Sequence, residues 1–564
     1  MKKIWLSVFF VALIVISSCS KSRQNSTLDP LTGQKSMHIT ADLSPDGDVV
    51  GKAVVGYQGW FSAAGDGSPL NSWQHQNLEM WPDVREYKTT YAGSNFSQAA
   101  VTQPNFYGNL GNGQPAKMFS SYDQQVMNTH VLWMKQSGID CAALQRFGSN
   151  VVPGTVLKQQ RDGISLLMMN AAQTYGLKFY IMYDCNGNSP MEADWTNTIV
   201  GAQNLISSPA YARQNGKPVV CFWGIGFSGR GPVADWLAKI NWFKSQGCYV
   251  IGGTPGNFST DTVYRAAYEA LDMIMPWFVG KRSNFQASYV SDLAWCSARN
   301  IDYQACCYPG FAFNNSNTAK PKNEIPRNHG DFMWSMFAGM RNAGVHNLYI
   351  AMFDELNEAT SIFKTAEDVS MQPAGNYFLP LDADGVHVSS DFYLRLVKDG
   401  IRMVKQQASY QAAHTTPFTL TLPANGTYKI INRGSGLALD AQNQGTANGT
   451  RIQQWTYSGG NNQRWILTNI GNNRYKIVGV QSNRSLDVKD NSLLHGAPVQ
   501  LYDYTGNDNQ TWIIAPTTNG YYTIQVARSG MLMEIAGAST SAGATVQQGG
   551  SNGGNNQQWI FQAP

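Results

Sequence analysis

The chain has 564 residues, of which 14% are charged and 12% aromatic, and its formal net charge is +4 at pH 7. Such a length predicts more than one domain. The charge is too small for a strongly basic surface, so we expect no nucleic-acid partner and no other polyanionic partner.

Lys2 and Lys3 open the chain, and an apolar run follows them over residues 4–16. This run is shorter than the roughly 20 residues that cross a bilayer, so it predicts a secretory signal peptide. The run leads into Ser-Ser-Cys, which resembles the lipobox of bacterial lipoproteins and implies that Cys19 becomes the acylated first residue. The alternative is an ordinary signal peptide that is cut near Ser18.

The lipobox interpretation divides the start of the chain into a signal peptide over 1–18 and a polar tether over 19–49. It predicts a protein that a lipid anchor holds in the bacterial cell envelope, at the outer membrane or the cell surface. No later segment has the length and hydrophobicity of a membrane span.

Seven further cysteines form an odd set, which argues against a complete disulfide framework. Most of them lie in apolar runs where a small buried side chain fits, although a single disulfide bond stays open. Neither cysteines nor histidines show the spacing of a metal site, so we expect no metal and no cofactor. The seven are Cys141, Cys185, Cys221, Cys248, Cys296, Cys306 and Cys307.

Apolar segments alternate with longer amphipathic stretches over residues 50–407. Continuous apolar runs such as LKFYIMYD are typical of strands that are buried on both faces. Eight such strands with room for crossover helices predict a (β/α)8 barrel of the TIM type. A doubly wound sheet is the alternative, but no Gly-rich phosphate turn follows the first strand. The expected strands are 54–61, 139–147, 177–184, 218–225, 248–252, 272–278, 301–308 and 347–354.

Catalytic groups of such barrels stand at the C-terminal ends of the strands. Arg146 ends the second strand, where an unpaired charge is costly, and we expect it to form a salt bridge, with Asp184 as the candidate partner. Other polar and aromatic side chains at strand ends are expected to bind substrate, although Trp223 and Trp277 would also suit core packing. The expected contacts are Asp184, Trp223, Trp277 and Tyr308.

The eighth strand leads into FDELNEAT, which places two glutamates three residues apart. Glycoside cleavage needs two carboxyl groups around one bond and flat aromatic walls for the sugar rings. We therefore predict that Glu355 and Glu358 are catalytic. The alternative is that the two glutamates lie on an exposed helix and merely face solvent. Asp354 should point away from the site if Glu355 points into it, because side chains alternate along a strand.

The segment FDELNEATSIF resembles the NEWHEGT signature of glycoside hydrolase family 99, the endo-acting α-mannosidases, and of related family 71/99-like proteins. The segments VVGYQGWF, NSWQHQ and MWPDVREY are similar to the first strand and its loop in this clan. This resemblance covers residues 50–405 and implies that Tyr57, Trp73 and His75 contact the substrate. Leu-Asn replaces Trp-His between the glutamates, so the sugar subsites next to them are expected to differ. The substrate of the family is therefore a poor guide to the substrate of this protein.

The resemblance also implies a retaining mechanism in which Glu355 assists the 2-hydroxyl of the substrate in attacking the anomeric carbon. Glu358 would protonate the leaving oxygen and then activate water. The inverting α-1,3-glucanases of family 71 are the related alternative, in which the two carboxyl groups lie further apart. A rival of another class is a carbohydrate-binding lipoprotein whose barrel is inert.

A linker over 408–423 leads to a pattern, Gln-x-Trp, that recurs three times at equal steps of 47 residues and ends at Trp465, Trp512 and Trp559. Equal spacing with aligned flanks predicts a threefold repeat of short strands. The repeats resemble ricin B-type lectins, which implies a β-trefoil over 424–564 that binds a polysaccharide or oligosaccharide. We expect the Trp of each motif to lie in the core and the Gln to bond to backbone.

Sugar binding in a trefoil lobe uses an aromatic ring that stacks on the pyranose, with a carboxylate and an amide for its hydroxyls. In the third lobe Gly549 replaces the aromatic residue and Glu534 the aspartate, so we expect little or no binding there. The expected binding residues are Asp440, Trp455 and Asn462 in the first lobe and Asp487, Tyr502 and Asn509 in the second.

Overall fold

The computed structural model describes residues 26–28, 35–37 and 43–564, except residues 76, 94–106, 420–421, 472 and 518–520. The chain forms two units, Met1–Thr40 and Ala41–Pro564. In the first unit, β1 (Ser26–Leu28) and β2 (Lys35–Met37) form an antiparallel pair. The predicted signal peptide and Cys19 lie outside the described residues. None of the helices in the described part is both long and apolar enough to cross a membrane.

A closed barrel of parallel strands follows in the second unit. The seventh strand of the barrel is split in two, and its halves pair with the sixth and the eighth strand, which closes the sheet. All eight predicted strands are present, so the predicted (β/α)8 architecture is confirmed. The strands are β3 (Ala53–Tyr57), β6 (Cys141–Phe147), β7 (Lys178–Asp184), β9 (Lys217–Trp223), β10 (Tyr249–Pro255), β11 (Met273–Trp277), β12 (Asp302–Tyr303) with β13 (Ala305–Cys307), and β14 (Leu348–Ile350).

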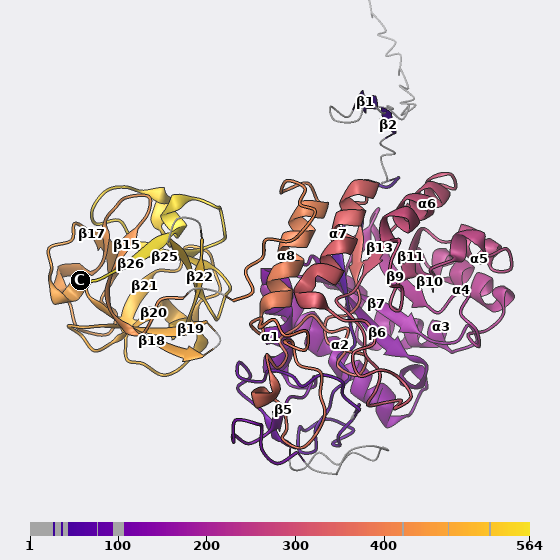
Figure 1. Ribbon diagram of the computed structural model, residues 1–564, viewed down its shortest axis with the longest axis horizontal. Coiled ribbons are helices and arrows are strands. Elements are labelled where there is room, and N and C mark those ends of the chain that lie inside the picture. Colours follow the sequence, from indigo (N-terminus) through magenta and orange to yellow (C-terminus); the bar gives the residue numbers. More distant parts are fainter. Residues whose placement is uncertain are drawn as a thin grey trace, which may run out of the picture. The chain divides into compact units, whose positions relative to one another are not determined.

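Helices surround the barrel on its outside (Figure 1). Their ends follow ordinary capping rules: the Thr155 side chain accepts a hydrogen bond from the Lys158 N–H at the start of α2, and Gly176, with φ +68°, ends it. Short two-stranded additions are β4 (Tyr91–Ala92) with β5 (Lys117–Met118), and β8 (Arg213–Gln214) against β9. The helices are α1 (Gln124–Gln136), α2 (Val156–Tyr175), α3 (Met191–Asp194), α4 (Val233–Ser245), α5 (Arg265–Glu269), α6 (Phe285–Ser297), α7 (Asp331–Ala343) and α8 (Phe392–Val404).

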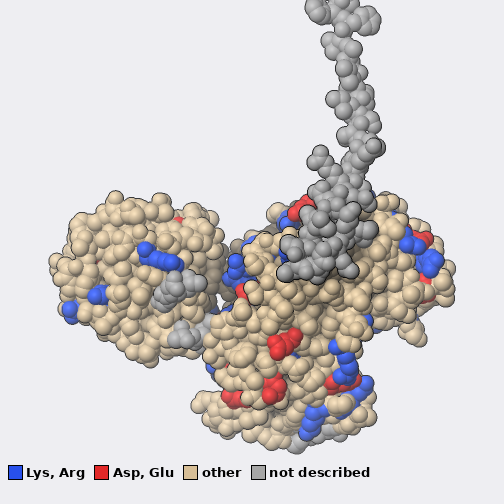
Figure 2. Space-filling model, turned by 45° about the horizontal axis from the view of Figure 1, so that its top comes forward, with Lys and Arg blue, Asp and Glu red and all other residues tan. Residues whose placement is uncertain are grey.

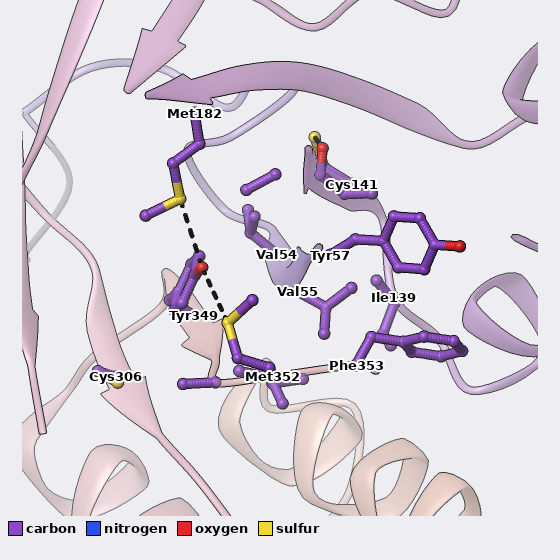
Figure 3. Close-up of a cluster of buried hydrophobic side chains, with 14 of the residues drawn as sticks. Val54, Val55, Tyr57, Ile139, Cys141, Met182, Cys306, Tyr349, Met352 and Phe353 are labelled. Carbon is purple, nitrogen blue, oxygen red and sulfur yellow. Dashed lines mark hydrogen bonds between the residues drawn. The ribbon is translucent and has the colours of Figure 1, made fainter. Parts of the chain in front are cut away.

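Met182, Tyr349 and Met352 fill the barrel interior beneath the C-terminal strand ends (Figure 3). The Tyr349 hydroxyl donates to the sulfur atoms of Met182 and Met352 at 3.5 and 3.6 Å. Gly56 on β3 faces this cluster, and any side chain there would collide with the Tyr349 hydroxyl and the Met352 sulfur. The cluster therefore closes the barrel below its polar rim and requires glycine at position 56.

Arg146 is fully buried on the helix side of β6. Its guanidinium bonds to Asp162 at 2.6 Å and to Asp194 at 2.8 Å. The predicted salt bridge exists, but the proposed partner Asp184 was wrong. The reason is alternation: Arg146 points outward to α2 and α3, whereas Asp184 stands at the inner rim and pairs with Arg230 at 2.7 Å.

All seven cysteines of the barrel are buried and free, so the disulfide bond that the sequence left open is absent from the described part of the chain. Within the same residues no cluster of His, Cys, Asp and Glu has the geometry of a metal site. Charged side chains are sparse on the face drawn in Figure 2, most of which carries neither acidic nor basic residues. This surface fits the low charged fraction of 14%.

The C-terminal residues form a β-trefoil of three four-stranded lobes. Two strands of each lobe join a six-stranded antiparallel barrel, which closes when the last strand pairs with the first. The other two strands of each lobe form a hairpin. The lobes are β15 (Gly426–Asn432), β16 (Ala438–Ala441), β17 (Ile452–Trp455) and β18 (Trp465–Gly471); β19 (Arg474–Gly479), β20 (Ser485–Val488), β21 (Val499–Tyr502) and β22 (Trp512–Pro516); and β23 (Tyr522–Val526), β24 (Leu532–Ile535), β25 (Val546–Gly549) and β26 (Trp559–Gln562).

The repeated motif is structural, as predicted. Trp465, Trp512 and Trp559 are buried in the trefoil core, and each indole N–H donates to a backbone carbonyl of its own lobe. The glutamines bond to backbone on both sides. Gln510, for example, accepts from the Thr505 N–H and donates to the Asp503 carbonyl, at 2.7 and 2.8 Å.

Candidate active site and lectin pockets

Glu355 lies where the chain leaves the eighth strand of the barrel, and it is only 3% exposed. One carboxylate oxygen accepts the N–H groups of Asn357 at 2.7 Å and Glu358 at 3.2 Å, and the Gln58 side chain also bonds to this carboxylate. Burial and the neighbouring Glu358 raise the pKa of Glu355 well above its usual value, while these donors oppose the rise. Glu355 is thus a desolvated carboxylate that several fixed donors hold in place.

Glu358 stands three residues further on and is half-buried. Burial, followed by the negative charge of Asp184, raises the pKa of Glu358 to about 7. No hydrogen-bond donor contacts its carboxyl group among the residues described here, in contrast to Glu355. Because the charge of Glu358 raises the pKa of Glu355, the two carboxyl groups cannot both ionise without an electrostatic cost, so the pair holds a proton near neutral pH.

Asp184 ends β7 at the inner rim, as predicted. Burial raises its pKa, and the salt bridge to Arg230 opposes that rise. The Arg230 guanidinium also lies over the Trp223 ring, 5.0 Å from its centre. Asp184 therefore has a counter-ion, whereas no described cation forms a salt bridge with Glu355 or Glu358.

Asp354 lies beyond the last residue of β14, and its fully buried carboxylate bonds to backbone N–H groups. Its two oxygens accept the N–H groups of Gln58 at 2.8 Å and Gly59 at 2.7 Å. These bonds tie the turn after the eighth strand to the end of the first strand. Asp354 is a structural carboxylate.

Aromatic rings line one side of the site. Trp60 stacks on His75, with ring centres 3.7 Å apart, and on Phe147, with ring centres 5.1 Å apart. Burial and the nearby Arg161 lower the pKa of His75 to about 3, so its imidazole is neutral. His75 therefore contributes a flat neutral ring to this side, and its predicted place near the site is consistent with the structure.

A second aromatic group stands on the opposite arc of the rim, at the ends of β9 and β11. Trp223 and Trp277 meet edge to face, with ring centres 5.5 Å apart, and both are partly exposed. Trp223 also stacks on Phe227 at 4.6 Å. Partly exposed indoles at strand ends suit sugar rings, which have apolar faces.

Two predicted substrate contacts are not supported by their positions. Tyr57 is fully buried on the helix side of β3, where its hydroxyl lies 2.9 Å from Nδ1 of His130. Tyr308 is fully buried as well, and its hydroxyl donates to the Lys281 carbonyl. Both pack against helices: Tyr57 on His130 of α1, and Tyr308 edge to face on Phe332 of α7. Trp73 is only 8% exposed and belongs to the hydrophobic core.

Gln58, Trp60 and Arg230 were not predicted from the sequence, and the fold brings them to the site. The signal for Gln58 was alternation on the first strand: once Gly56 faces the interior, residue 58 does so too. Trp60 and Arg230 follow strand ends in irregular segments. Sequence periodicity gives no direction for such residues.

The first two trefoil lobes have matching polar pockets. Asp440 accepts from the amides of Gln453 and Asn462 at 2.9 and 2.8 Å, and the nearby Trp455 ring is 46% exposed. In the second lobe Asp487 accepts from Gln500 and Asn509 at 2.9 and 2.7 Å, and Tyr502 is 42% exposed. The second pocket has a volume of about 270 Å³ and is lined by Asp487, Asn509, Tyr502 and their neighbours.

The third lobe differs in the way the sequence suggested. The Glu534 carboxylate accepts from Gln547 at 2.8 Å and from Gln557, the motif glutamine, at 2.7 Å. Gly549 lies directly against this carboxylate, so any side chain at position 549 would collide with it. The longer acid therefore occupies the space beside position 549, and the lobe has no stacking ring there.

Comparison with known proteins agrees with this trefoil. Residues 417–502 and 508–564 match the family described as ricin-type beta-trefoil lectin domain-like. A designed threefold symmetric protein, ThreeFoil, is 42% identical over 25% of this chain and 100% of its own, with a TM-score of 0.25. An exo-beta-1,3-galactanase from Clostridium thermocellum, 1,3Gal43A, is 34% identical over 28% of this chain and 33% of its own, with a TM-score of 0.25.

A GH99 endo-alpha-mannosidase from Bacteroides thetaiotaomicron is 15% identical over 64% of this chain and 98% of its own, with a TM-score of 0.47. No curated protein matches the chain.

The family match covers the Gln-x-Trp repeats and agrees with the three-lobed sheet. The segment that begins at residue 417 is therefore a ricin-type β-trefoil lectin-like domain.

Proposed function

We propose that this protein is a glycoside hydrolase whose barrel cleaves a glycan with Glu355 and Glu358 and whose trefoil holds the enzyme on carbohydrate. The observation that carries the proposal is the pair of desolvated carboxyl groups after the eighth strand, between two groups of aromatic side chains. Glycoside cleavage needs one protonated and one ionised carboxyl group around the bond. The proposed substrate is an α-mannoside or a related polysaccharide that is cut internally.

The two glutamates have different surroundings, which supports different roles. Fixed N–H donors oppose the rise in the pKa of Glu355 that burial and Glu358 cause, so Glu355 is the proposed base that takes the proton of the sugar 2-hydroxyl. Glu358 lacks such donors among the described residues, and the charge of Asp184 favours its protonated form. Glu358 is thus the proposed acid for the leaving oxygen.

The proposed reaction has two steps and retains the configuration. In the first, the 2-oxygen attacks the anomeric carbon as Glu355 removes its proton, and the glycosidic bond breaks as Glu358 protonates the departing oxygen. In the second, Glu358 removes a proton from water, which attacks the anomeric carbon, and the bond between that carbon and the 2-oxygen breaks as Glu355 returns its proton to the 2-oxygen. An inverting hydrolase would instead use one glutamate as the acid and the other as a base for water, in a single step. NMR of the anomeric configuration of the first-formed product distinguishes the two mechanisms.

Replacing either acid by its amide tests the catalytic assignment. Glu355→Gln and Glu358→Gln should each lower kcat/KM by about 10³-fold or more, because each removes a group that acts in bond cleavage. Glu269→Gln, on the outer helix α5, is the control and should keep the wild-type rate. Glu358→Gln should be partly spared with a leaving group that needs no protonation. Near-native turnover by either active-site variant would leave a carbohydrate-binding protein with an inert barrel.

The pH dependence of kcat/KM should report the shared proton. Activity should fall as pH rises through about 7, because the acid Glu358 loses its proton there. Asp184→Asn should move this limb to lower pH, since it removes a negative charge that raises the pKa of Glu358. A pH profile on a soluble oligosaccharide, with thermal melts at each pH, checks this. An alkaline limb that does not move in Asp184→Asn would contradict the electrostatic assignment.

Binding to an insoluble or long polysaccharide should depend on two trefoil lobes. Trp455→Ala and Tyr502→Ala should each weaken binding several-fold, and the double variant about 100-fold, because two weak sites on one scaffold bind a polymer by avidity. Affinity electrophoresis of the full chain measures this. Glu534→Gln in the third lobe is the matched control and should bind like the wild type. Equal losses in all three lobes would mean that the binding lobes are wrongly assigned.

We also propose that the mature protein is lipid-anchored through Cys19, on the support of the Lys-Lys start, the short apolar run and the Ser-Ser-Cys end. Wild-type protein should partition with membranes and incorporate labelled fatty acid. Cys19→Ala should lose the label and should either be released or remain unprocessed, because the anchor holds by burying its acyl chains. Wild-type protein found only in the soluble fraction would contradict the anchor and leave the hydrolase proposal standing.

A further inference from the structure

Two glutamine side chains point into the barrel at its C-terminal rim, on neighbouring strands. On β3 the side chain of Tyr57 packs outward on His130, while position 56 faces the interior cluster, so Gln58 also faces inward. On β6 Arg146 points outward to α2 and α3, so the preceding Gln145 faces inward. Both strands thus place an amide inside the barrel.

These two amides stand at the same height. Tyr57 pairs with Leu144 in the parallel ladder between β3 and β6, so Gln58 and Gln145 are one residue further along both strands. Met182 is level with Gln145 on the neighbouring strand, and its sulfur contacts the hydroxyl of Tyr349, which is level with Val54 and so lies deeper in the barrel (Figure 3). Gln58 also bonds to the Glu355 carboxylate, so the pair adjoins the proposed catalytic site.

In both amides the oxygen lacks a hydrogen-bond partner in the described protein. The side-chain oxygens of Gln58 and Gln145 are buried and accept no hydrogen bond there, and the two residues are 6% and 3% exposed. The Gln145 amide nitrogen has one weak contact, to the Met182 sulfur at 4.0 Å. Buried polar atoms are nearly always hydrogen-bonded, and an apolar side chain of similar shape would fill this space without an unpaired oxygen.

We propose that Gln58 and Gln145 form an amide pair that binds the hydroxyl groups of the sugar ring next to Glu355. The inference rests on the proposed function and names the side chains that read the substrate. An amide both accepts and donates, which matches a hydroxyl group, and it adds no charge beside the two glutamates. A site that leaves buried amides unpaired when a hydroxyl is missing discriminates strongly against the deoxy or wrongly configured sugar.

The test compares Gln145→Met with Gln304→Met. Methionine keeps the length of glutamine and removes the amide. Gln304 is also fully buried with both amide atoms unpartnered in the described protein, but it precedes Ala305, which is level with the starts of β14 and β3, at the other end of the barrel. We expect kcat/KM to fall at least about tenfold in Gln145→Met and to stay within about twofold in Gln304→Met. Neither variant should lower the thermal midpoint, because each removes an unpaired buried amide.

Mono-deoxy substrates identify the hydroxyl group. For one of them, wild-type protein and Gln145→Met should have equal kcat/KM, since the contact is already missing. Gln58→Met should lower kcat/KM and also shift the pH profile, because its amide bonds to Glu355. Wild-type rates in Gln145→Met on every cleaved substrate would overturn the inference and leave the hydrolase intact.

Calorimetry of oligosaccharide binding, in a Trp455→Ala, Tyr502→Ala background that silences the trefoil, separates the inference from the hydrolase proposal. If the barrel binds a glycan without cleaving it, the hydrolase proposal fails, and a tenfold weaker Kd in Gln145→Met still supports the amide pair. An unchanged Kd in that case overturns it. A barrel that neither binds nor cleaves any glycan of the panel overturns both.

Discussion

The candidate active site depends on the alternation of side chains along the parallel strands of the barrel. Because both faces of each strand are buried, one residue packs on the helices and the next points into the interior. On the first strand this rule sends Tyr57 to His130 and Gln58 to the rim. On the second it sends Arg146 to two carboxylates and leaves Gln145 inside. A shift of one residue in the register of a strand would turn its core side chains toward the site and its site side chains toward the core.

Electrostatics separates the two sides of the barrel wall. On the outer side, Arg146 is buried with two carboxylates, so its charge is compensated and its role is structural. At the inner rim, three acids share a desolvated space, and of these only Asp184 has a counter-ion among the described residues. Uncompensated buried charge lowers stability, and proteins concentrate it where protons must be moved. Gln58 and Gln145, whose side-chain oxygens have no partner in the described protein, lie at the same inner rim.

Comparison of the three trefoil lobes distinguishes the structural residues from those predicted to bind sugar. The three motif tryptophans keep the same place and the same backbone bond in every lobe. The pocket residues vary, since they are not needed to close the barrel of strands. In the third lobe Glu534 and Gly549 change together, and the larger acid occupies the space that the missing ring leaves. The lobe keeps its fold after losing its stacking surface.

The sequence alone predicted the (β/α)8 barrel, the threefold lectin-like module and the position of Glu355 and Glu358 after the eighth strand. These features follow from local patterns: apolar runs, equal spacing and a short motif at a strand end. The partner predicted for Arg146 was wrong, and Tyr57 and Tyr308, which were predicted to contact the substrate, are fully buried. Those errors arose because a residue near a strand end was treated as part of the rim without regard to its direction.

Only the tertiary structure decided which side chains meet. Gln58 and Glu355 are nearly 300 positions apart in the chain and become neighbours because the first and eighth strands pair when the barrel closes. The raised pKa of Glu358 and the unpaired oxygen of Gln145 likewise arise from desolvation and from contacts between distant segments. Local sequence patterns determine which elements form, whereas burial and charge at a point in space depend on every element that surrounds it.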